Sequence, residues 1–531
     1  MVMTSTQTLS FPEAQARTQA SYDEFPYISH AFPQTHPARM AAIGTLFNLE
    51  MPPVETASVL EIGCASGGNL IPLASTYPKA RFLGVDLSTI QIEDGRRRIE
   101  AQGLTNIELR QQDISAFRSP GHRFDYIICH GVYSWVSEPV RHAILKVCSR
   151  YLKLRGVAYV SYNVLPGWRP KQILRDALMA HVGQTSNQRE RVTRAREFMG
   201  FLNQHTPNNP YGAAVKDSVA ELQKATDEYL AHEFLELDNA PCSFHDFMHA
   251  SGQHKLAFLG ESDINMMVAD NFGPDLAKSL RALSANDLHA TENYIDVLTG
   301  RTFRQTLLIN PERAQAVRRL IDSQRLENLH LIADITEVPS PIPELPYCFE
   351  SRQGRQLRVS REPVRKALQL MASRRPSTSN LSQLLTDLES SGETLSSQDR
   401  ADIGGALLQG VLSGLFSART RPIEAATADT EKPKAIALAR KDAAGGRTRS
   451  ANLRHESVDL GVVAQHILPV MDGTLDRDGL CAHLEARAKA GALHFQRNGQ
   501  QITDEADIAA CAREHLGNAI QWLASNALLE A

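Results

Sequence analysis

The chain has 531 residues, of which 42% are hydrophobic and 22% are charged. This balance is typical of folded globular proteins and argues against a disordered or fibrous chain. Lysine and arginine number 56 against 60 aspartate and glutamate residues, so the net charge is −4. Such a charge argues against a protein that mainly coats nucleic acid. At about 150 residues per domain, the length predicts three or four domains.

The sequence also indicates a reducing compartment. Its seven cysteines form no C-x-x-C pair, so neither a disulfide framework nor a structural zinc site is expected. The N-terminal residues lack a charged segment followed by an apolar one, and no apolar run approaches the ~20 residues of a membrane span. The histidines that invite a metal site are not spaced as a ligand cluster: His36, His130, His232 and His245. We therefore expect a cytoplasmic protein with no membrane span and no metal.

Short apolar runs and helical segments alternate over the first third of the chain. The apolar runs are those expected of buried strands, at residues 58–63, 81–86, 107–110, 124–129 and 156–162. Segments compatible with helices separate them, at 67–76, 88–102 and 137–152. This alternation predicts an α/β fold with a parallel sheet that is covered by helices on both faces.

The alternation stops after residue 162. Only helical spacing marks 170–255, and strands at 256–260 and 303–309 are expected to complete the sheet. An Asn-Gly pair within 493–502 predicts a hairpin, and 379–420 and 461–531 both have the pattern of small winged-helix units. The expected division is an N-terminal cap segment (1–45), a core in two parts (46–170 and 255–315), a helical insertion (171–254), a middle α+β domain (316–421), an exposed linker (422–457) and a C-terminal helical, winged-helix-like domain (458–531).

The most informative segment is VLEIGCASGGN, residues 59–69, where a buried strand runs into a turn of small residues that opens a helix. Gly63 and Gly67 leave space where a Cβ would collide with a nucleotide. Asp86 ends the second strand, where its carboxylate can accept both ribose hydroxyls. Asp113 follows the third strand, where it can meet an adenine amino group. All of these lie at the C-terminal edge of the sheet, the expected ligand crevice of an open α/β fold.

This pattern leaves two cofactor classes open. Gly63, Ala65 and Gly68 also satisfy a relaxed dinucleotide fingerprint with Asp86 as the ribose acid, so NAD is a rival. Glu61 helps to separate the two, because a carboxylate before the first glycine suits a cationic ligand and suits a pyrophosphate badly. A turn that merely joins a strand to a helix is a third interpretation, which the register of the two aspartates weakens.

The glycine turn, the ribose acid and Gln112-Asp113-Ile114 resemble those of the class I S-adenosylmethionine-dependent methyltransferases. More closely, the chain is similar over nearly its whole length to bacterial methyltransferases that carry a methyltransferase regulatory domain. The motifs that carry this similarity are YDEFPY (22–27), THP (35–37), NLIP (69–72), DLS (86–88), CHGVYSW (129–135), GVAYVSYN (156–163) and PGW (166–168). The regulatory block is YLAHEFLE (229–236), and NLRHE (452–456) resembles the entry into the C-terminal domain.

The resemblance implies a Rossmann-like, seven-stranded methyltransferase sheet that binds S-adenosylmethionine. The residues that we predict to bind this cofactor are Glu61, Gly63, Ala65, Gly67, Asn69, Asp86, Leu87, Gln91, Asp113, Ile114, His130 and Gly131. Two positions depart from the family pattern. Ala65 stands where many relatives have glycine, at a small cost in space, and Arg169 stands where many have histidine. Contact between Arg169 and the substrate would alter acceptor preference.

The resemblance also implies an acceptor, because characterised relatives are protein-lysine methyltransferases that act on a bacterial outer-membrane surface protein. A lysine must lose its proton before methylation, and aromatic side chains can orient the amine. The candidates for this catalytic pocket are Tyr162, Tyr133, Trp168, Tyr22 and Tyr27, with Trp135 beside them. Each of them, taken singly, is equally well explained as a core aromatic.

A protein substrate is therefore expected, and nucleic acid is not. The arginine-rich segment 189–196 is interpreted as a solvated helix face. Two alternatives stay open at this point. The enzyme could methylate a small molecule or another polymer, or the chain could be a cofactor-binding regulatory protein without turnover.

Overall fold

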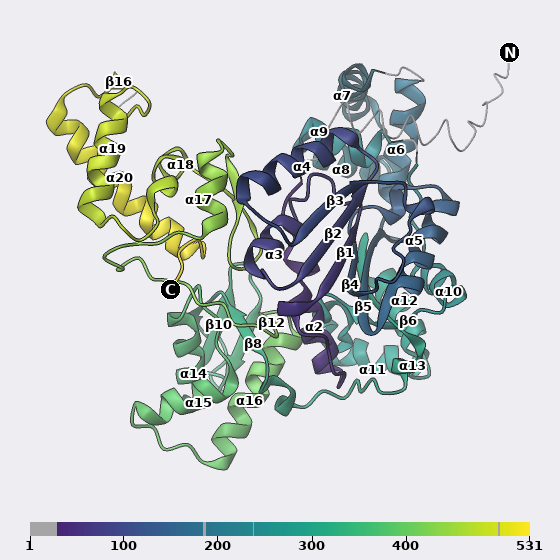
Figure 1. Cartoon of the computed structure of the whole chain (residues 1–531). Coiled ribbons are helices and arrows are strands. Elements are labelled where there is room, and N and C mark those ends of the chain that lie inside the picture. Colours follow the sequence, from purple (N-terminus) through teal and green to yellow (C-terminus); the bar gives the residue numbers. More distant parts are fainter. Residues whose placement is uncertain (1–28, 184–186, 237, 498–499) are drawn as a thin grey trace.

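The computed structural model describes residues 29–183, 187–236, 238–497 and 500–531. Tyr22 and Tyr27, two of the predicted pocket aromatics, lie outside these residues. Figure 1 shows three parts: a large α/β domain in purple to teal, a smaller middle unit in green and a C-terminal unit in yellow. None of the helices in the described part of the chain combines the length and the apolarity that crossing a membrane requires.

A seven-stranded sheet forms the centre of the α/β domain, with the strand order β3-β2-β1-β4-β5-β7-β6. Its strands are β1 (Ser58–Ile62), β2 (Arg81–Asp86), β3 (Ile107–Gln111), β4 (Phe124–Cys129), β5 (Leu152–Asn163), β6 (Ala257–Glu261) and β7 (Phe303–Ile309). The Rossmann-like, seven-stranded sheet implied by the resemblance is thus confirmed. The expectation that all strands are parallel is wrong at β7, which runs antiparallel to β5 and β6. A continuous apolar run indicates burial on both faces of a strand, and it does not report the direction of the strand.

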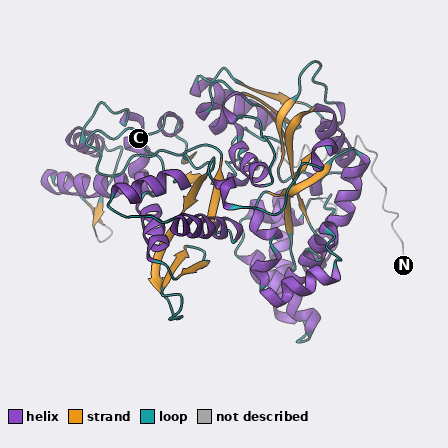
Figure 2. Cartoon of the chain, turned by 90° about the horizontal axis from the view of Figure 1, so that it is seen from below, coloured by secondary structure: helices purple, strands orange, loops and turns teal. Residues whose placement is uncertain are grey.

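Helices flank the sheet, as the second view shows (Figure 2). The three helices expected between the first strands are α3 (Leu70–Thr76), α4 (Thr89–Gln102) and α5 (Glu138–Tyr151). α4 begins where the Ser88 side chain accepts a hydrogen bond from the Gln91 N–H, and it ends at Gly103, whose φ of 65° forms a left-handed cap. The other helices of this domain outside the insertion are α2 (Pro37–Leu46), α11 (Pro274–Leu283), α12 (Leu288–Thr299) and α13 (Pro311–Ala314).

The helical insertion between β5 and β6 has a core of its own. Its helices are α6 (Arg169–Val182), α7 (Gln188–His205), α8 (Pro210–Gln223), α9 (Asp227–Phe234) and α10 (Phe244–Gln253). Leu178, Met199 and Phe234 are among the residues that α6 to α9 bury together. We expected the arginine-rich face of α7 to be solvated, but only part of it is. Arg191 is buried and donates a hydrogen bond to the Leu235 carbonyl, because it closes the contact between α7 and the end of α9.

The middle unit shares its hydrophobic core with the α/β domain. It contains β8 (His330–Ala333), β9 (Ile335–Pro339), β10 (Tyr347–Ser351), β11 (Gln356–Val359), α14 (Glu362–Ser373), α15 (Leu381–Ser390), α16 (Ser397–Leu412) and β12 (Phe416–Arg419). Leu368 and Leu407 of this unit belong to the same buried cluster as Val59 and Tyr126 of the sheet. The two units therefore pack as one body.

The C-terminal unit has a separate core and begins earlier than expected. It contains α17 (Ala437–Ala444), β13 (Arg449–Ala451), β14 (Ser457–Asp459), α18 (Val462–Ile467), α19 (Arg477–Lys489), β15 (Gln496–Arg497), β16 (Gln500–Gln501) and α20 (Glu505–Ser525). β15 and β16 pair antiparallel at the position of the predicted hairpin.

Residues 422–457, expected to be an exposed linker, are instead packed into this unit. Ala435 and Ala439 are fully buried in its core, and Asp442 forms a buried ion pair of 2.7 Å with Arg98 of α4. The prediction was wrong because it rested on the lack of bulky apolar residues in this segment. Small alanines and a buried carboxylate hold the segment in place instead.

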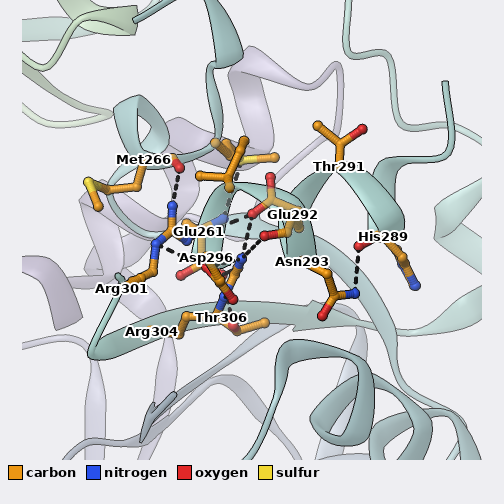
Figure 3. A network of polar contacts seen from close by, with 12 residues as sticks. Glu261, Met266, His289, Thr291, Glu292, Asn293, Asp296, Arg301, Arg304 and Thr306 are labelled. Atoms are coloured by element: carbon orange, nitrogen blue, oxygen red, sulfur yellow. Dashed lines mark hydrogen bonds and ion pairs between the residues drawn. The ribbon is translucent and has the colours of Figure 1, made fainter. Parts of the chain in front are cut away.

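A buried charge network joins β6, β7 and α12 (Figure 3). Arg304 is fully buried, and its guanidinium reaches three carboxylates at 2.8–2.9 Å: Glu261, Glu292 and Asp296. Arg301 adds a second cation, with its Nε 3.2 Å from Asp296 Oδ1. The Arg304 guanidinium also lies 4.2 Å from the ring centre of Phe244, at the start of α10. The network therefore fixes the antiparallel strand and the end of the insertion to one another.

Replacing Arg304 by methionine should lower the free energy of unfolding by about 3–5 kcal/mol, since it leaves three carboxylates buried beside one remaining cation. Burial already raises the pKa of Glu292 from 4.5 to about 7, and removal of Arg304 will raise the carboxyl pKa values further. A carboxyl whose pKa is raised on folding loses stability as the pH rises through that pKa, so the deficit should be larger at pH 8 than at pH 5. Urea denaturation at the two pH values measures both effects.

The matched control is Arg281→Gln, because Arg281 forms an exposed ion pair with Asp270. Its effect should stay within about 0.5 kcal/mol. An equal loss of stability in the two variants would show that the buried network contributes no more than a surface pair.

Candidate cofactor and acceptor site

A cavity lies at the carboxyl ends of β1, β2, β3 and β4, at the edge where the sequence places the cofactor. The predicted cofactor residues that line it are Glu61, Gly63, Ala65, Asn69, Asp86, Leu87, Gln91, Asp113, Ile114, His130 and Gly131. Gly67 is not among the lining residues. It lies behind the turn with a φ of 74°, where a Cβ would come within 3.1 Å of Leu109 Cδ1. Gly67 thus shapes the turn, and the direct cofactor contact predicted for it has no support in the cavity lining.

The turn after β1 is held in an unusual backbone conformation by Asp86. Gly63 has a φ of 73°, and a Cβ there would stand 2.3 Å from Val132 Cγ2. Ala65, where relatives have glycine, has a φ of 47°, a left-handed conformation that non-glycine residues rarely adopt. Its N–H donates to Asp86 Oδ2 at 2.8 Å, and the Ser88 N–H donates to Asp86 Oδ1 at 2.9 Å. A carboxylate has further acceptor capacity, so Asp86 is oriented to receive ribose hydroxyls.

The adenine end of the cavity is formed after β3. Asp113 begins a short 3-10 helix (Ile114–Ala116), and its side chain accepts a hydrogen bond of 2.8 Å from the Ser115 N–H. Ile114, beside it, is buried and offers an apolar wall. A half-buried carboxylate next to an apolar surface matches the amino group and the flat face of a purine.

Glu61 carries an oxygen that is ready for a cationic group. The side chain is buried, and its Oε1 accepts a hydrogen bond of 2.7 Å from Asn69 Nδ2. Its Oε2 has no hydrogen-bond partner among the described residues. Burial raises the pKa of Glu61 to about 8, and an ammonium group at Oε2 would favour the carboxylate form. S-adenosylmethionine presents an amino group, whereas the pyrophosphate of NAD would add negative charge beside Glu61, so these residues fit the former.

Asn69 joins this carboxylate to two distant segments. Its Oδ1 accepts hydrogen bonds from the Phe32 N–H at 3.1 Å, from Thr35 Oγ1 at 3.1 Å and from His455 Nε2 at 2.7 Å. Burial lowers the pKa of His455 to about 3, so its imidazole is neutral and carries the proton on Nε2. A residue of the C-terminal unit therefore lies one side chain away from Glu61.

His130 forms a neutral wall of the cavity. Burial lowers its pKa to about 4. Its Nδ1 lies 2.9 Å from the Tyr159 hydroxyl and 3.2 Å from Ser161 Oγ, and the ring of Phe32 packs on it with centroids 4.2 Å apart. A neutral imidazole can line the site of a sulfonium without the repulsion that an imidazolium would cause.

Of the aromatics predicted for the acceptor pocket and described in the structure, Trp135 lines the cavity, whereas Tyr162, Tyr133 and Trp168 do not. Tyr162 is buried against Phe247 of α10, with stacked rings 4.1 Å apart, and its hydroxyl lies 3.3 Å from Thr306 Oγ1. Tyr133 packs edge-on against the same Phe247, and Trp168 packs behind Trp135. The cavity lining therefore gives no support to the acceptor roles predicted for Tyr162, Tyr133 and Trp168.

The reason lies in the alternation of side chains along β5. Ser161 points to His130, so Tyr162, one residue later, points to the opposite face of the sheet. A residue near the end of a strand lies at that edge of the sheet, but this position does not tell on which face of the sheet its side chain lies. Arg169, whose departure from the family pattern was noted, is exposed at the start of α6 and does not line the cavity.

Several lining residues were missed by the sequence analysis. Phe32 is one of them, and it lies in a segment with no regular pattern. The insertion supplies His232, Glu233 and Asp238. The block 229–236 carries part of the family resemblance, but nothing in its spacing shows that His232 and Glu233 line a cavity.

Three family models match the chain: a methyltransferase domain at 59–156, a predicted methyltransferase regulatory domain at 226–310 and the PKMT C-terminal winged helix domain at 431–528. An uncharacterized protein of Rickettsia prowazekii is 33% identical over 530 residues, covering 96% of this chain and 93% of that protein. The chain belongs to the class I S-adenosylmethionine-dependent methyltransferases that carry a regulatory domain. The winged-helix model begins within the segment that we expected to be a linker, in agreement with its packing.

Solved structures give the same family. PKMT2 from Rickettsia typhi, solved in complex with AdoHcy, is 29% identical and has a TM-score of 0.83, covering 95% of this chain and 100% of that one. A second Rickettsia prowazekii protein, also uncharacterized, is 39% identical over 230 residues and covers 43% of this methyltransferase. The likeness to PKMT2 thus extends through the insertion, the middle unit and the winged helix.

We expect Asp86→Ala to weaken binding of S-adenosylhomocysteine at least ~100-fold. The substitution removes the proposed ribose acceptor and two charge-assisted hydrogen bonds that hold the turn, each of which contributes about 1.5–3 kcal/mol. Calorimetric titration with S-adenosylmethionine, S-adenosylhomocysteine and NAD measures the effect, and Asp270→Ala, at an exposed position, serves as control. Binding of NAD in place of the two sulfur ligands would refute the assignment of the cavity.

We also expect His455→Ala to weaken cofactor binding about fivefold, although His455 is outside the cavity. It removes one of the three hydrogen bonds that Asn69 Oδ1 accepts, and a hydrogen bond of this kind contributes about 1 kcal/mol. The same titration detects the change. His494→Ala, an exposed histidine of the winged-helix domain, should leave the affinity unaltered, and equal affinities in both variants would show that the contact with Asn69 is not used.

Proposed function

We propose that this methyltransferase modifies lysine side chains of a protein substrate. The observation that carries the proposal is the position of Glu233 and Asp238, two carboxyl groups from the insertion that line the same cavity as the predicted cofactor residues. No part of the cofactor is assigned to these two residues, so they are left for the acceptor. An acceptor that enters a cavity between carboxyl groups is itself cationic, as the ammonium group of lysine is.

The rest of the cavity suits the stem of a lysine. Trp135, Val136 and Val140 contribute aromatic and aliphatic surface to the lining. A lysine side chain has four methylene groups that gain from such contact, and the face of an indole attracts an ammonium group. The winged-helix family model and the Rickettsia typhi neighbour both carry the name PKMT, in keeping with the resemblance to protein-lysine methyltransferases in the sequence.

The mechanism requires the acceptor amine to lose a proton, and Glu233 is suited to hold it. Burial raises the pKa of Glu233 from 4.5 to about 7, while Lys171 and His232 nearby act in the opposite direction. A carboxyl with a pKa near neutrality exchanges protons efficiently at physiological pH. S-adenosylmethionine, when bound, supplies a methyl group that is already activated. Glu61 and Asp86 would hold it, and the carboxyl groups of the insertion would orient and deprotonate the acceptor.

The proposed substrate is a bacterial outer-membrane surface protein, by resemblance to the characterised relatives. We place the enzyme in the cytoplasm, where it would act on the substrate before export. The described structure offers no feature that favours a small-molecule acceptor. A cofactor-binding protein without turnover is distinguished directly, because it would release no S-adenosylhomocysteine in the presence of an acceptor.

Glu233→Gln should lower kcat/KM for a lysine acceptor about 10- to 100-fold, because the amide can neither carry the negative charge nor accept the proton. In the unaltered enzyme kcat/KM should rise as the pH rises through about 7, where the Glu233 carboxyl ionises, and the variant should lose this inflection. The measurement is release of S-adenosylhomocysteine with a recombinant fragment of an outer-membrane surface protein, together with mass spectrometry of its lysines.

The control is Glu197→Gln, which changes an exposed carboxyl on α7. The affinity for S-adenosylhomocysteine should remain the same in both variants. If Glu233→Gln retains both the rate and the inflection, the acidic end of the cavity does not receive the acceptor amine.

A further inference from the structure

A second cavity, of about 550 Å³, lies where the three parts of the molecule meet, away from the cofactor site. α2 contributes Arg39, and the β10–β11 turn and β12 of the middle unit contribute Arg352, Arg355 and Arg419. The winged-helix domain contributes Arg454. Figure 1 shows α2 beside β12 and β8 at this junction. The volume is in the range of small-molecule sites in proteins.

The lining carries an excess of positive charge. Five arginines face three carboxylates, which are Asp263, Asp334 and Glu456. Two of these carboxylates are already neutralised. Arg39 pairs with Asp263 at 2.8 Å, and Arg454 reaches both oxygens of Asp334 at 2.8 and 3.0 Å. Arg375 also pairs with Asp334 at 2.8 Å.

Three lining arginines are left without a carboxylate. Within the described ranges, no Asp or Glu is in ion-pair contact with Arg352, Arg355 or Arg419. The Arg355 guanidinium donates to the backbone carbonyls of Ser413 and Gly414 and to the side-chain oxygen of Asn265, and all of these acceptors are neutral. Arg352 is exposed on the β10–β11 turn, so the cavity can be reached from solvent on that side.

Arg419 is the most unusual of the three. It is only 4% exposed, and its Nε has no hydrogen-bond partner in the described part of the chain. Its Nη2 lies 3.5 Å from His36 Nε2, a weak contact, and the Tyr77 side chain lies beside it. Arg39 and Arg454, whose charges act on Arg419, are of the same sign. A guanidinium buried in this way is costly unless an anion compensates it.

We propose that this cavity binds a phosphate-bearing small molecule, with Arg419, Arg355 and Arg352 as its main ligands. The planar guanidinium presents paired donors that match the oxygens of phosphate, and it stays charged at all physiological pH values. An excess of two positive charges in the lining matches a dianion better than a single carboxylate. The site is separate from the cofactor cavity, and the inference does not depend on the identity of the methyl acceptor.

The same short segment of chain borders both cavities. Pro33 and His36 line the phosphate site, whereas His30 and Phe32 line the cofactor site and Phe32 hydrogen-bonds to Asn69. Phosphate binding that stabilises residues 30–36 will therefore favour the cofactor-binding arrangement of Asn69 and Glu61. By linkage the effect is reciprocal, so the cofactor should also increase the affinity for the anion. The cavity is a regulatory site of the methyltransferase.

Calorimetric titration of the full chain with pyrophosphate, at constant ionic strength, tests the proposal. We expect saturable binding, a concentration-dependent rise of the melting temperature, and an affinity for S-adenosylhomocysteine that increases at least twofold when pyrophosphate is present. Arg352→Gln and Arg419→Gln should each weaken pyrophosphate binding tenfold or more. Arg281→Gln, which removes an exposed arginine elsewhere, should leave it unchanged. Arg352 is exposed, so its variant tests the site even if Arg419→Gln fails to fold.

Three outcomes would overturn the proposal. The first is the absence of saturable pyrophosphate binding. The second is binding that Arg352→Gln leaves unchanged and Asp86→Ala abolishes, which would place the anion in the cofactor cavity. The third is saturable binding of citrate without binding of pyrophosphate, which would assign the site to carboxylates. Failure of any of these tests would not affect the lysine proposal, because that proposal is measured by methyl transfer in Glu233→Gln.

Discussion

The side-chain amide of Asn69 is the contact on which the arrangement of this enzyme depends. It lies at the start of α3, donates to Glu61 and accepts from the N-terminal segment and from His455. In a buried environment each of these groups needs a partner, and the amide is small enough to meet all of them at once. One oxygen of Glu61 is left facing the cavity. The cofactor site is thus completed by residues almost four hundred positions apart in the chain.

The two C-terminal units are attached to the methyltransferase domain in different ways. The middle unit continues its hydrophobic core, so the two cannot separate without exposing apolar surface. The winged-helix domain has its own core and is joined by polar pairs, Arg98 with Asp442 and Arg454 with Asp334, and by a small apolar cluster that includes Leu438 and Ile71. Polar interfaces are typical of domains whose relative position can change. His455 therefore makes the cofactor site sensitive to the position of the winged-helix domain.

The features that the sequence predicted well are those set by local constraints. A glycine with positive φ after an apolar strand, and an aspartate at the end of the next strand, leave few alternatives for the backbone. The predictions that failed needed information from elsewhere in the fold. Tyr162 lies at the predicted end of β5, but its side chain is on the face of the sheet opposite the cavity. The alanines of 422–457 are buried because other elements approach them closely. Glu233 reaches the cavity only because α9 folds back over it, which no spacing in the chain reveals.

The role of the insertion follows from how it is anchored. Its last helix, α10, is held by the stacking of Arg304 on Phe244 and by the packing of Phe247 on Tyr162. α9 is connected to that helix by a short segment, which is tied to the end of β5 because the Cys242 carbonyl accepts a hydrogen bond of 3.0 Å from the Leu165 N–H and the Cys242 N–H donates to the Asn163 carbonyl at 3.2 Å. The carboxyl groups of Glu233 and Asp238 are therefore positioned by β5 and β7, the strands next to the cofactor edge. Because the cavity has one wall from the sheet and one from the insertion, a shift of the insertion would move the acceptor end and leave the cofactor end in place. In the proposed mechanism, a movement of the insertion would therefore change methyl transfer and leave the cofactor contacts of Glu61 and Asp86 in place.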